Sequence, residues 1–422
     1  MRRDCGRSSL WRKQISLIKQ DEAEIRRRTL AVLAVATGIG SVGLAAGGTA
    51  GALLGANLTG TEAAAGLPLG LLVVGQAIAA LVVSRRTRHA GRGRSLILGY
   101  VLGALGAALV IFAAVSSNFV TLLAGSIVLG AGNAAIFLTR YAAGELGGEA
   151  ARGRSLGVVL FATAFGAILS PNLLGPGGEV ARMLGLPPLT GLYLLAILSF
   201  VISAILLAAI SYPGVPYLGQ GAALLGPREM TRSTPQQAIS SRGIWPARVA
   251  LVVLGATNLV MVSVMAVAPV HLSTHGHSLD LVGIVIGVHV AGMFVPSPVS
   301  GRIADRIGGV PIAALGILLL VVTGIAGALV NQDSVAWIIV VLAVLGIGWN
   351  LGIVGGSMLL AASVPPDLRP RTEGLGEVAM GVAAGVGAPI AGMVVSIGSL
   401  STLLLSGAGV AALTFVFLRP KG

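Results

Sequence analysis

Charged residues are scarce in this chain of 422 residues, because Asp, Glu, Lys and Arg together make up only 10% of it. Soluble globular domains carry about a quarter. Aromatic residues are also few, at 4%, which leaves little material for an aromatic ligand cage. The single cysteine, Cys5, excludes an intrachain disulfide. A phosphate-binding loop of the form G-x-x-x-x-G-K does not occur in the sequence, so transport driven directly by ATP is not expected.

Long uncharged apolar segments occupy most of the chain instead. Hydrophobic residues make up 55% of it, and the mean hydropathy is +0.93. Because about 20 apolar residues cross a bilayer as a helix, these segments indicate membrane spans. We predict an all-α membrane protein with twelve transmembrane helices in two pseudo-symmetric six-helix bundles. The predicted spans are 29–56, 66–84, 95–115, 119–140, 155–176, 190–211, 247–270, 281–301, 311–331, 335–361, 372–396 and 400–418.

The longest interval between spans divides the chain into two halves. Residues 212–246 contain five prolines, which is typical of a linker. The predicted organisation is an N-terminal tail (1–28), a six-helix bundle (29–211), the linker (212–246), a second six-helix bundle (247–418) and a short C-terminal tail (419–422). Both tails and the linker are expected to be cytoplasmic.

Positive charge is divided very unevenly between the two sides of this arrangement. Of the 28 lysines and arginines, 27 lie on the side of both termini, and Arg182 alone lies on the other. Since cytoplasmic loops carry such an excess, both termini are expected in the cytoplasm and the chain in the cell membrane. The net charge of +13 therefore reports topology, and no nucleic-acid partner is expected.

The two predicted halves resemble each other in sequence at an offset of about 217 residues. Equivalent positions in equivalent spans carry the same residue. The pairs are Gly38 with Gly255, Gly75 with Gly292, Asn133 with Asn350, and Arg154 with Arg371. Because each half has six spans, the two copies have the same orientation, which is a parallel repeat.

The loop between spans eight and nine reads Gly-Arg-Ile-Ala-Asp-Arg-Ile-Gly-Gly and resembles the major facilitator signature G-x-x-x-D-R-x-G-R. The matching residues are Gly301, Asp305, Arg306 and Gly308. The N-terminal copy of the loop has Arg88 in place of the aspartate, whereas Gly91 and Arg92 match. The resemblance covers the whole chain and implies a secondary transporter with the major facilitator fold.

A second motif lies in span five and is similar to the antiporter signature G-x-x-x-G-P-x-x-G-G. It consists of Gly166, Ser170, Pro171 and Gly175, with Ser170 and Leu174 as departures. The signature is associated with drug–proton antiporters of the superfamily, so the resemblance implies export. The arginine that those antiporters carry in span four is missing here, because Ser126 lies near its position.

The resemblance also implies a gate at the loops. In the family the aspartate caps a helix of the opposite half, so the partner of Asp305 would be the start of span five, near Arg154. Arg88 would face the start of span eleven, which carries Glu373 and Glu377. We predict an ion pair between Arg88 and one of these glutamates. The alternatives are a plain turn at Asp305 and a mobile surface arginine at Arg88.

Ionisable residues inside spans are candidates for function. Glu377, with Glu373 one turn before it, is a candidate for carrying a coupling proton or for structural pairing between the halves. His289, near the centre of span eight, could titrate, bind substrate or make a helix contact. The cluster His271, His275 and His277 is a weak candidate for a metal site, with an exposed loop as the default interpretation.

Polar side chains at membrane depth are the candidates for lining a substrate cavity, with helix–helix hydrogen bonds as the alternative. They are Gln76, Asn133, Asn258, Trp349 and Asn350. The sequence thus predicts a transporter of a neutral, amphipathic or weakly cationic small molecule, working by alternating access as an exporter, with protons as a candidate coupling ion. An importer or facilitator of a metabolite or metal ion is the first alternative. A non-transporting scaffold, regulator or enzyme is the second. No enzymatic activity or cofactor is expected, and the bilayer and the substrate are the expected partners of a monomer.

Overall fold

A computed structural model describes residues 5–44, 46, 50–60, 66–210, 245–274, 279–329 and 334–418. Within these ranges every regular element is a helix. Most of the predicted linker, residues 211–244, and the tail 419–422 lie outside the described residues.

The described part of the N-terminal half contains seven α-helices. They are α1 (Cys5–Gly40), α2 (Gly51–Thr59), α3 (Gly66–Ala90), α4 (Arg92–Val115), α5 (Phe119–Asn172), α6 (Leu174–Met183) and α7 (Gly191–Ile210), with short 3-10 turns at Ser41–Gly43 and Pro188–Thr190. The helices of the C-terminal half are α10 (Trp245–Thr274), α11 (Leu279–Phe294), α12 (Ser297–Ile307), α13 (Gly309–Leu329), α14 (Val335–Ala362), α15 (Arg369–Ile397) and α16 (Leu400–Leu418).

Ten segments of the described chain are long and apolar enough to cross a membrane. One of them, Phe119–Leu169 in α5, has 51 residues and would be about 75 Å long, more than twice the thickness of the hydrocarbon core. The backbone of α5 breaks at Gly148 (φ 62°) and Ala151, so this segment makes two crossings. The first crossing, interrupted between α1 and α2, completes the predicted twelve. The prediction of an all-α fold with twelve membrane helices is confirmed.

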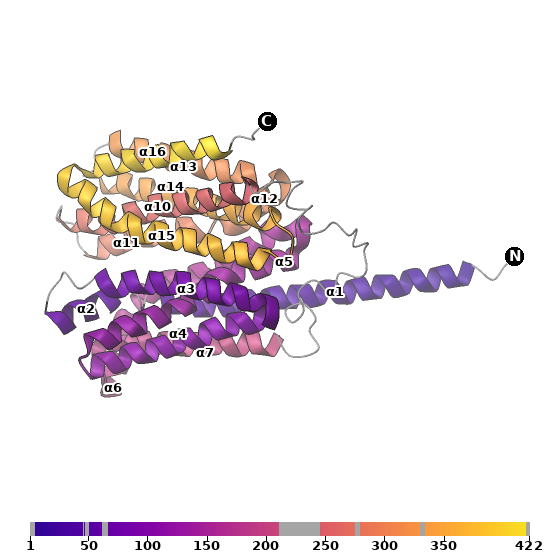
Figure 1. Cartoon of the computed structure of the whole chain (residues 1–422), viewed down its shortest axis with the longest axis horizontal. Coiled ribbons are helices and arrows are strands. Elements are labelled where there is room, and N and C mark those ends of the chain that lie inside the picture. The colour runs from indigo at the N-terminus through magenta and orange to yellow at the C-terminus, as the bar shows by residue number, and fades with distance from the viewer. Residues whose placement is uncertain are drawn as a thin grey trace.

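Helix α1 extends well beyond the bundle at the end where α12 and the break in α5 lie (Figure 1). Residues 5–28, predicted to form a tail, therefore continue the first crossing as one helix. Glu24 forms ion pairs of 3.0 Å and 2.8 Å with Arg27 and Arg28 on this exposed part.

Helices within each half approach closely where small residues face each other. A Cβ atom added to Gly75 of α3 would lie only 1.9 Å from the carbonyl oxygen of Ile127 in α5. Such contacts are typical of membrane helices, which associate by close packing because lipid gives no hydrophobic driving force between them. Figure 1 shows the two halves as two layers, one with α3, α4 and α7 and the other with α10 and α13–α16. They meet where α3 packs on α15 and α5 packs on α12.

Candidate functional site between the two halves

Asp305, at the end of α12, accepts two backbone hydrogen bonds from the opposite half. The Gly153 amide donates to Oδ1 at 2.6 Å, and the Arg154 amide donates to Oδ2 at 2.9 Å. These amides are free because the break at Gly148–Ala151 starts a new helical segment, whose first N–H groups have no partner within the helix. A carboxylate is favoured there by the helix dipole as well. The predicted position of the Asp305 partner, beside Arg154, is confirmed.

The backbones of α5 and α12 touch next to this cap. A Cβ atom on Gly153 would lie 2.4 Å from the Gly301 carbonyl oxygen, and one on Gly301 would lie 2.1 Å from the Gly153 carbonyl oxygen. Because neither contact involves a side chain that could turn away, both positions require glycine for the halves to meet. Gly301 of the loop signature therefore has a packing role, whereas Arg306 is exposed.

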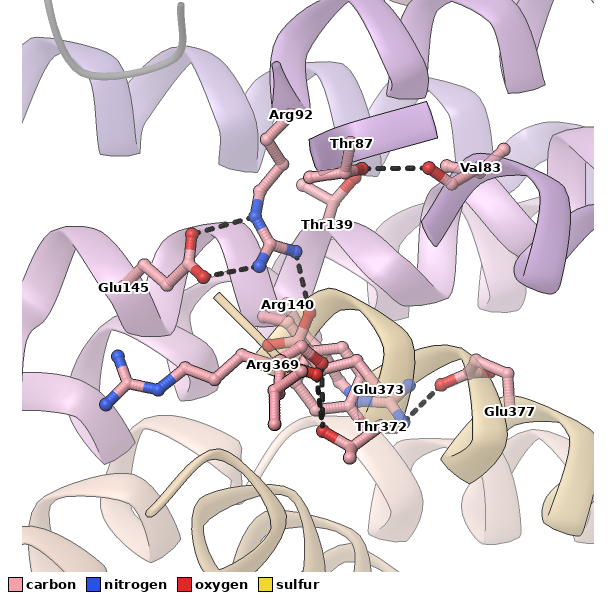
Figure 2. A network of polar contacts seen from close by, with 12 residues as sticks. Val83, Thr87, Arg92, Thr139, Arg140, Glu145, Arg369, Thr372, Glu373 and Glu377 are labelled. Atoms are coloured by element: carbon pink, nitrogen blue, oxygen red, sulfur yellow. Dashed lines mark hydrogen bonds and ion pairs between the residues drawn. The ribbon is translucent and has the colours of Figure 1, made fainter. Parts of the chain in front are cut away.

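Arg92, the first residue of α4, pairs with one carboxylate of its own half and one of the opposite half (Figure 2). Its Nε donates to Glu145 of α5 at 2.8 Å, and its Nη1 lies 2.9 Å from Glu373 Oε2 of α15. The side chains of Arg92 and Glu373 are 8% and 1% exposed, whereas Glu145 is 38% exposed. A bidentate arginine pair of this kind is stronger than a single hydrogen bond.

Arg140 forms a second and more deeply buried ion pair across the interface. Its Nη2 lies 2.6 Å from Glu377 Oε1 on α15, and the two side chains are 1% and 0% exposed. Tyr141 supports the guanidinium, with its hydroxyl at 3.2 Å and its ring centroid at 4.6 Å. Arg140 Nε also donates to Ser357 Oγ at 3.2 Å.

The predicted pairing of Arg88 was wrong. Arg88 lies in the last turn of α3 with an exposed side chain, while Glu373 and Glu377 are buried against other arginines. The reason is the direction of the chain after α3. Helix α3 ends at Ala90, and the chain turns back toward the interface at Gly91 (φ 82°), so the side chain of Arg92, and not that of Arg88, points inward. The predicted glutamates do pair with arginine, but with Arg92 and Arg140 and not with Arg88.

We expect Arg88→Gln to leave transport and thermal stability unchanged, because its side chain is exposed. Arg92→Gln is expected to lower the melting temperature of the purified protein by several degrees, since it leaves the buried Glu373 without its cation. A melting curve of the two variants in the same detergent tests this pair. An equal effect of both substitutions would contradict the assignment.

Internal symmetry explains where Arg140 sits. Ser357, which accepts its hydrogen bond, is equivalent to Arg140 in the repeat, at a separation of 217 residues. Residues equivalent by a two-fold axis meet only near that axis, so Arg140 lies where the halves join. Gly91 (φ 82°) and Gly308 (φ 89°) are equivalent too and turn the two loops in the same way. The loops differ in chemistry: one offers Asp305, the other Arg92.

The halves separate toward the opposite end. A Cβ atom on Gly374 of α15 would lie 2.6 Å from Ser84 Oγ of α3, and one on Gly381 would lie 3.4 Å from Ala77 Cβ. At Gly385, one turn further on the same face, no described atom lies within 4 Å. The inter-half ion pairs and the Asp305 cap all lie on the near side of this divergence. We call this closed part the arginine-rich end.

Three of the predicted cavity residues are held inside the C-terminal half. Asn258 Nδ2 donates to the Met380 carbonyl at 2.8 Å, and its Oδ1 accepts from Trp349 Nε1 at 3.0 Å. Asn350 is fully buried. Its Nδ2 donates to the Met293 carbonyl and to Ser297 Oγ, and its Oδ1 accepts from Ser300 Oγ. These groups make the helix–helix hydrogen bonds that the sequence left open as the alternative to lining a cavity.

The other predicted residues are placed as follows. Asn133 is buried, and its Oδ1 has no hydrogen-bond partner among the described residues, while Gln76 is half-buried. His289 Nδ1 is 2.8 Å from the Leu342 carbonyl oxygen, which is a helix contact. Of the histidine cluster, His271 borders an apolar pocket, whereas His275 and His277 lie outside the described residues.

Gly166 of the span-five motif packs against the interrupted first crossing. A Cβ atom there would lie 2.2 Å from Ser41 Oγ and 2.4 Å from the Val42 nitrogen. Gly175 has open space around it. The side chains of Ser170 and Pro171 are outside the described part of the chain. The motif therefore supplies at least one point of close approach between crossings one and five.

Comparisons with known proteins agree with this architecture. The sequence profile of the Major Facilitator Superfamily matches residues 29–353 and 249–421. YddS, an MFS-type transporter of Bacillus subtilis (strain 168), is 33% identical over 403 residues, which cover 94% of this chain and 92% of that protein. The riboflavin transporter RfnT of Brucella anthropi is 26% identical over 370 residues, 85% of this chain and 87% of that protein.

Solved structures show the same fold. The MFS transporter FucP in its outward conformation matches with a TM-score of 0.72 at 16% identity, over 94% of this chain and 99% of that one. The human organic anion transporter MFSD10 also gives 0.72 at 16% identity, over 93% and 99%. Two helical bundles that touch at one end and diverge at the other define a membrane transport protein. The chain belongs to the Major Facilitator Superfamily.

Proposed function

We propose that this transporter exports a small molecule across the cell membrane by alternating access, as a monomer with both termini in the cytoplasm. The observation that carries the proposal is the position of the polar contacts between the halves. Asp305, Arg92–Glu373 and Arg140–Glu377 all lie at the arginine-rich end, beyond which α3 and α15 diverge. With positive loops inside, this end is cytoplasmic, and the conformation faces outward.

The same contacts explain how such a gate can open. Burying two charges costs desolvation energy that their attraction repays only in part, so a buried ion pair adds little net stability. When the halves separate, both partners regain water. Removal of one partner inside the closed interface is far more costly. The pairs therefore favour a fully closed or a fully open end over intermediate states, which is what alternating access requires.

The substrate class follows from the scarcity of charge at membrane depth. Asn133 and Gln76 are the polar candidates that the helix contacts of the C-terminal half do not occupy. They favour a neutral or weakly cationic amphipathic substrate with hydrogen-bonding groups. A relative that is a riboflavin transporter fits this class, so flavins belong among the first compounds to test.

The proposal also covers the direction of transport, which is export, and the coupling ion, which is the proton. The span-five motif, with Gly166 packed on Ser41, supports export by its likeness to antiporters. Glu377 is the proposed proton carrier, because it is buried in a span and Arg140 releases it when the halves part. Its Oε2 has no hydrogen-bond partner among the described residues, which leaves one oxygen to take the proton.

Proteoliposomes test the function directly. We expect uptake of substrate into inside-out vesicles from a panel of flavins, lipophilic cations and antibiotics, with proton efflux from the vesicle lumen. Glu377→Gln is expected to abolish the proton signal. Arg182→Gln, on the exposed pair with Glu179 at the other end, is the control and should transport normally.

Each outcome separates the alternatives. Substrate movement with no proton signal in either protein would leave a facilitator. Movement in the opposite direction would indicate an importer. No movement of any compound, together with intact folding, would favour a scaffold or regulator of the same fold.

A further inference from the structure

A small, partly open pocket lies between the two halves at the arginine-rich end. It is bordered by Tyr141, Glu145 and Arg152 of α5, by Ser357 of α14 and by Arg369 of α15. Tyr141 and Ser357 are also the partners of Arg140, so the pocket adjoins the buried ion pair. The proposed transport cycle assigns no role to this pocket.

Two arginines at the pocket have no counter-ion. Arg152 is 8% exposed, and it makes no hydrogen bond or ion pair with any described side chain. Arg369 is half-buried, and its Nε is buried without a hydrogen-bond partner among the described residues. The two positive charges repel each other. Figure 2 shows the Arg369 side chain reaching toward the helix of Glu145, with its guanidinium joined to nothing drawn.

The carboxylates nearby are already engaged. Glu145 gives both oxygens to Arg92, which also holds Glu373, and Glu377 belongs to Arg140. The exposed Glu149, together with Glu145 and Glu373, attracts Arg369 from a distance. At the junction of the halves, four arginines thus face three paired glutamates and the exposed Glu149. The buried Nε of Arg369 is a donor without an acceptor, and burying such a group is costly, so the pocket favours an added negative charge.

We propose that this pocket binds an oxyanion, a phosphate or carboxylate group, between Arg152 and Arg369. Guanidinium groups bind such groups through paired hydrogen bonds. Because Arg152 belongs to the N-terminal half and Arg369 to the C-terminal half, the anion joins the halves and stabilises the closed arginine-rich end. Opening that end separates the two arginines and releases the anion. The site is regulatory and separate from the path of the transported molecule.

Binding of inorganic phosphate to the purified full chain tests the proposal. The protein is placed in nanodiscs of phosphatidylcholine and titrated with phosphate at constant ionic strength, with calorimetry and melting temperature as readouts. Wild type is expected to bind and to melt at a higher temperature. Arg152→Gln and Arg369→Gln are each expected to weaken binding by roughly tenfold or more, which is the loss of a charge-assisted hydrogen bond.

A second arm identifies the source of the anion. Nanodiscs that contain phosphatidylglycerol offer the same chemistry as a lipid headgroup. Phosphate binding in phosphatidylcholine supports a soluble anion, whereas stabilisation by phosphatidylglycerol alone, lost in both glutamine variants, supports a headgroup. Arg152→Lys and Arg369→Lys keep the positive charge, so they should retain weaker binding. They show whether a loss of binding in the glutamine variants comes from the lost charge or from misfolding.

The matched control is Arg371→Gln, which removes an exposed arginine two residues from Arg369. It should respond to either anion as wild type does. The proposal is overturned if wild type responds to neither phosphate nor phosphatidylglycerol. It is equally overturned if the double variant Arg152→Gln/Arg369→Gln, folded by its melting curve, responds as strongly as wild type.

Discussion

Replacing Arg140 with leucine is expected to destabilise the protein by about 3–5 kcal/mol, the cost of leaving a buried charge unpaired. Glu377 is 0% exposed and has its ion pair with Arg140, so the substitution leaves a carboxylate in the interface without a cation. The measurement is the melting temperature of the purified protein, which should fall far more than for Arg182→Leu. The exposed Arg182–Glu179 pair contributes less than about 1 kcal/mol.

The double variant Arg140→Leu/Glu377→Leu separates stability from function. Apolar residues that replace a whole buried ion pair often cost nothing, so the melting temperature should recover most of the loss. Transport should not recover. The two leucines stabilise the closed interface, and unlike the ion pair they gain no hydration energy when the halves separate, so the gate opens less readily. A double variant whose loss of stability equals the sum of the losses in Arg140→Leu and Glu377→Leu would show that the two residues act independently.

The twelve crossings were predictable because a span needs only length and apolarity. Residues 335–361, predicted as one span, correspond to α14, Val335–Ala362. Breaks within crossings left weaker signals. The interruption after Gly40 lies at the start of a glycine-rich stretch, and Pro296, which separates α11 from α12, has no N–H to continue a helix. Sequence alone cannot say how neighbouring helices accommodate such breaks.

The candidate site was predictable where the repeat applied and not where it failed. The Asp305 cap follows from the loop signature and the symmetry of the halves, and it lies where expected. Arg92 and Arg140 were missed as partners because their glutamates come from α15, more than two hundred residues away. One signal was available: Arg140 and Ser357 are equivalent in the repeat, which places Arg140 near the axis. Nothing in the sequence indicated that the turn after Ala90 directs Arg92, and not Arg88, toward the interface.

Replacing Gly301 with valine is expected to hold the halves apart at the arginine-rich end. A Cβ atom there would lie 2.1 Å from the Gly153 carbonyl oxygen, and both groups are backbone. Overpacking of this kind costs about 1–3 kcal/mol or more, enough to shift a two-state equilibrium by roughly 5- to 150-fold. Transport should fall by at least about fivefold, because the closed state at this end becomes rare.

Spin labels at the opposite end measure the shift. Ser117, in the turn before α5, and Ser399, in the turn before α16, are exposed and belong to different halves. The single Cys5 is replaced by serine, so cysteines at these two positions carry the labels. If the halves rock, the label distance should be shorter in Gly301→Val than in the parent.

The control for size is Gly287→Val, because a Cβ atom on that glycine of α11 meets no described atom within 4 Å. It should leave both the distance and transport unchanged. Helices α5 and α12 keep their own backbone hydrogen bonds in Gly301→Val, so the cost falls on the contact between the halves and the protein should remain folded. Gly153→Val disturbs the same contact from the other side, and combining the two should add little. A parental distance in Gly301→Val would mean that the arginine-rich end closes without this glycine contact, and that the ion pairs alone hold it.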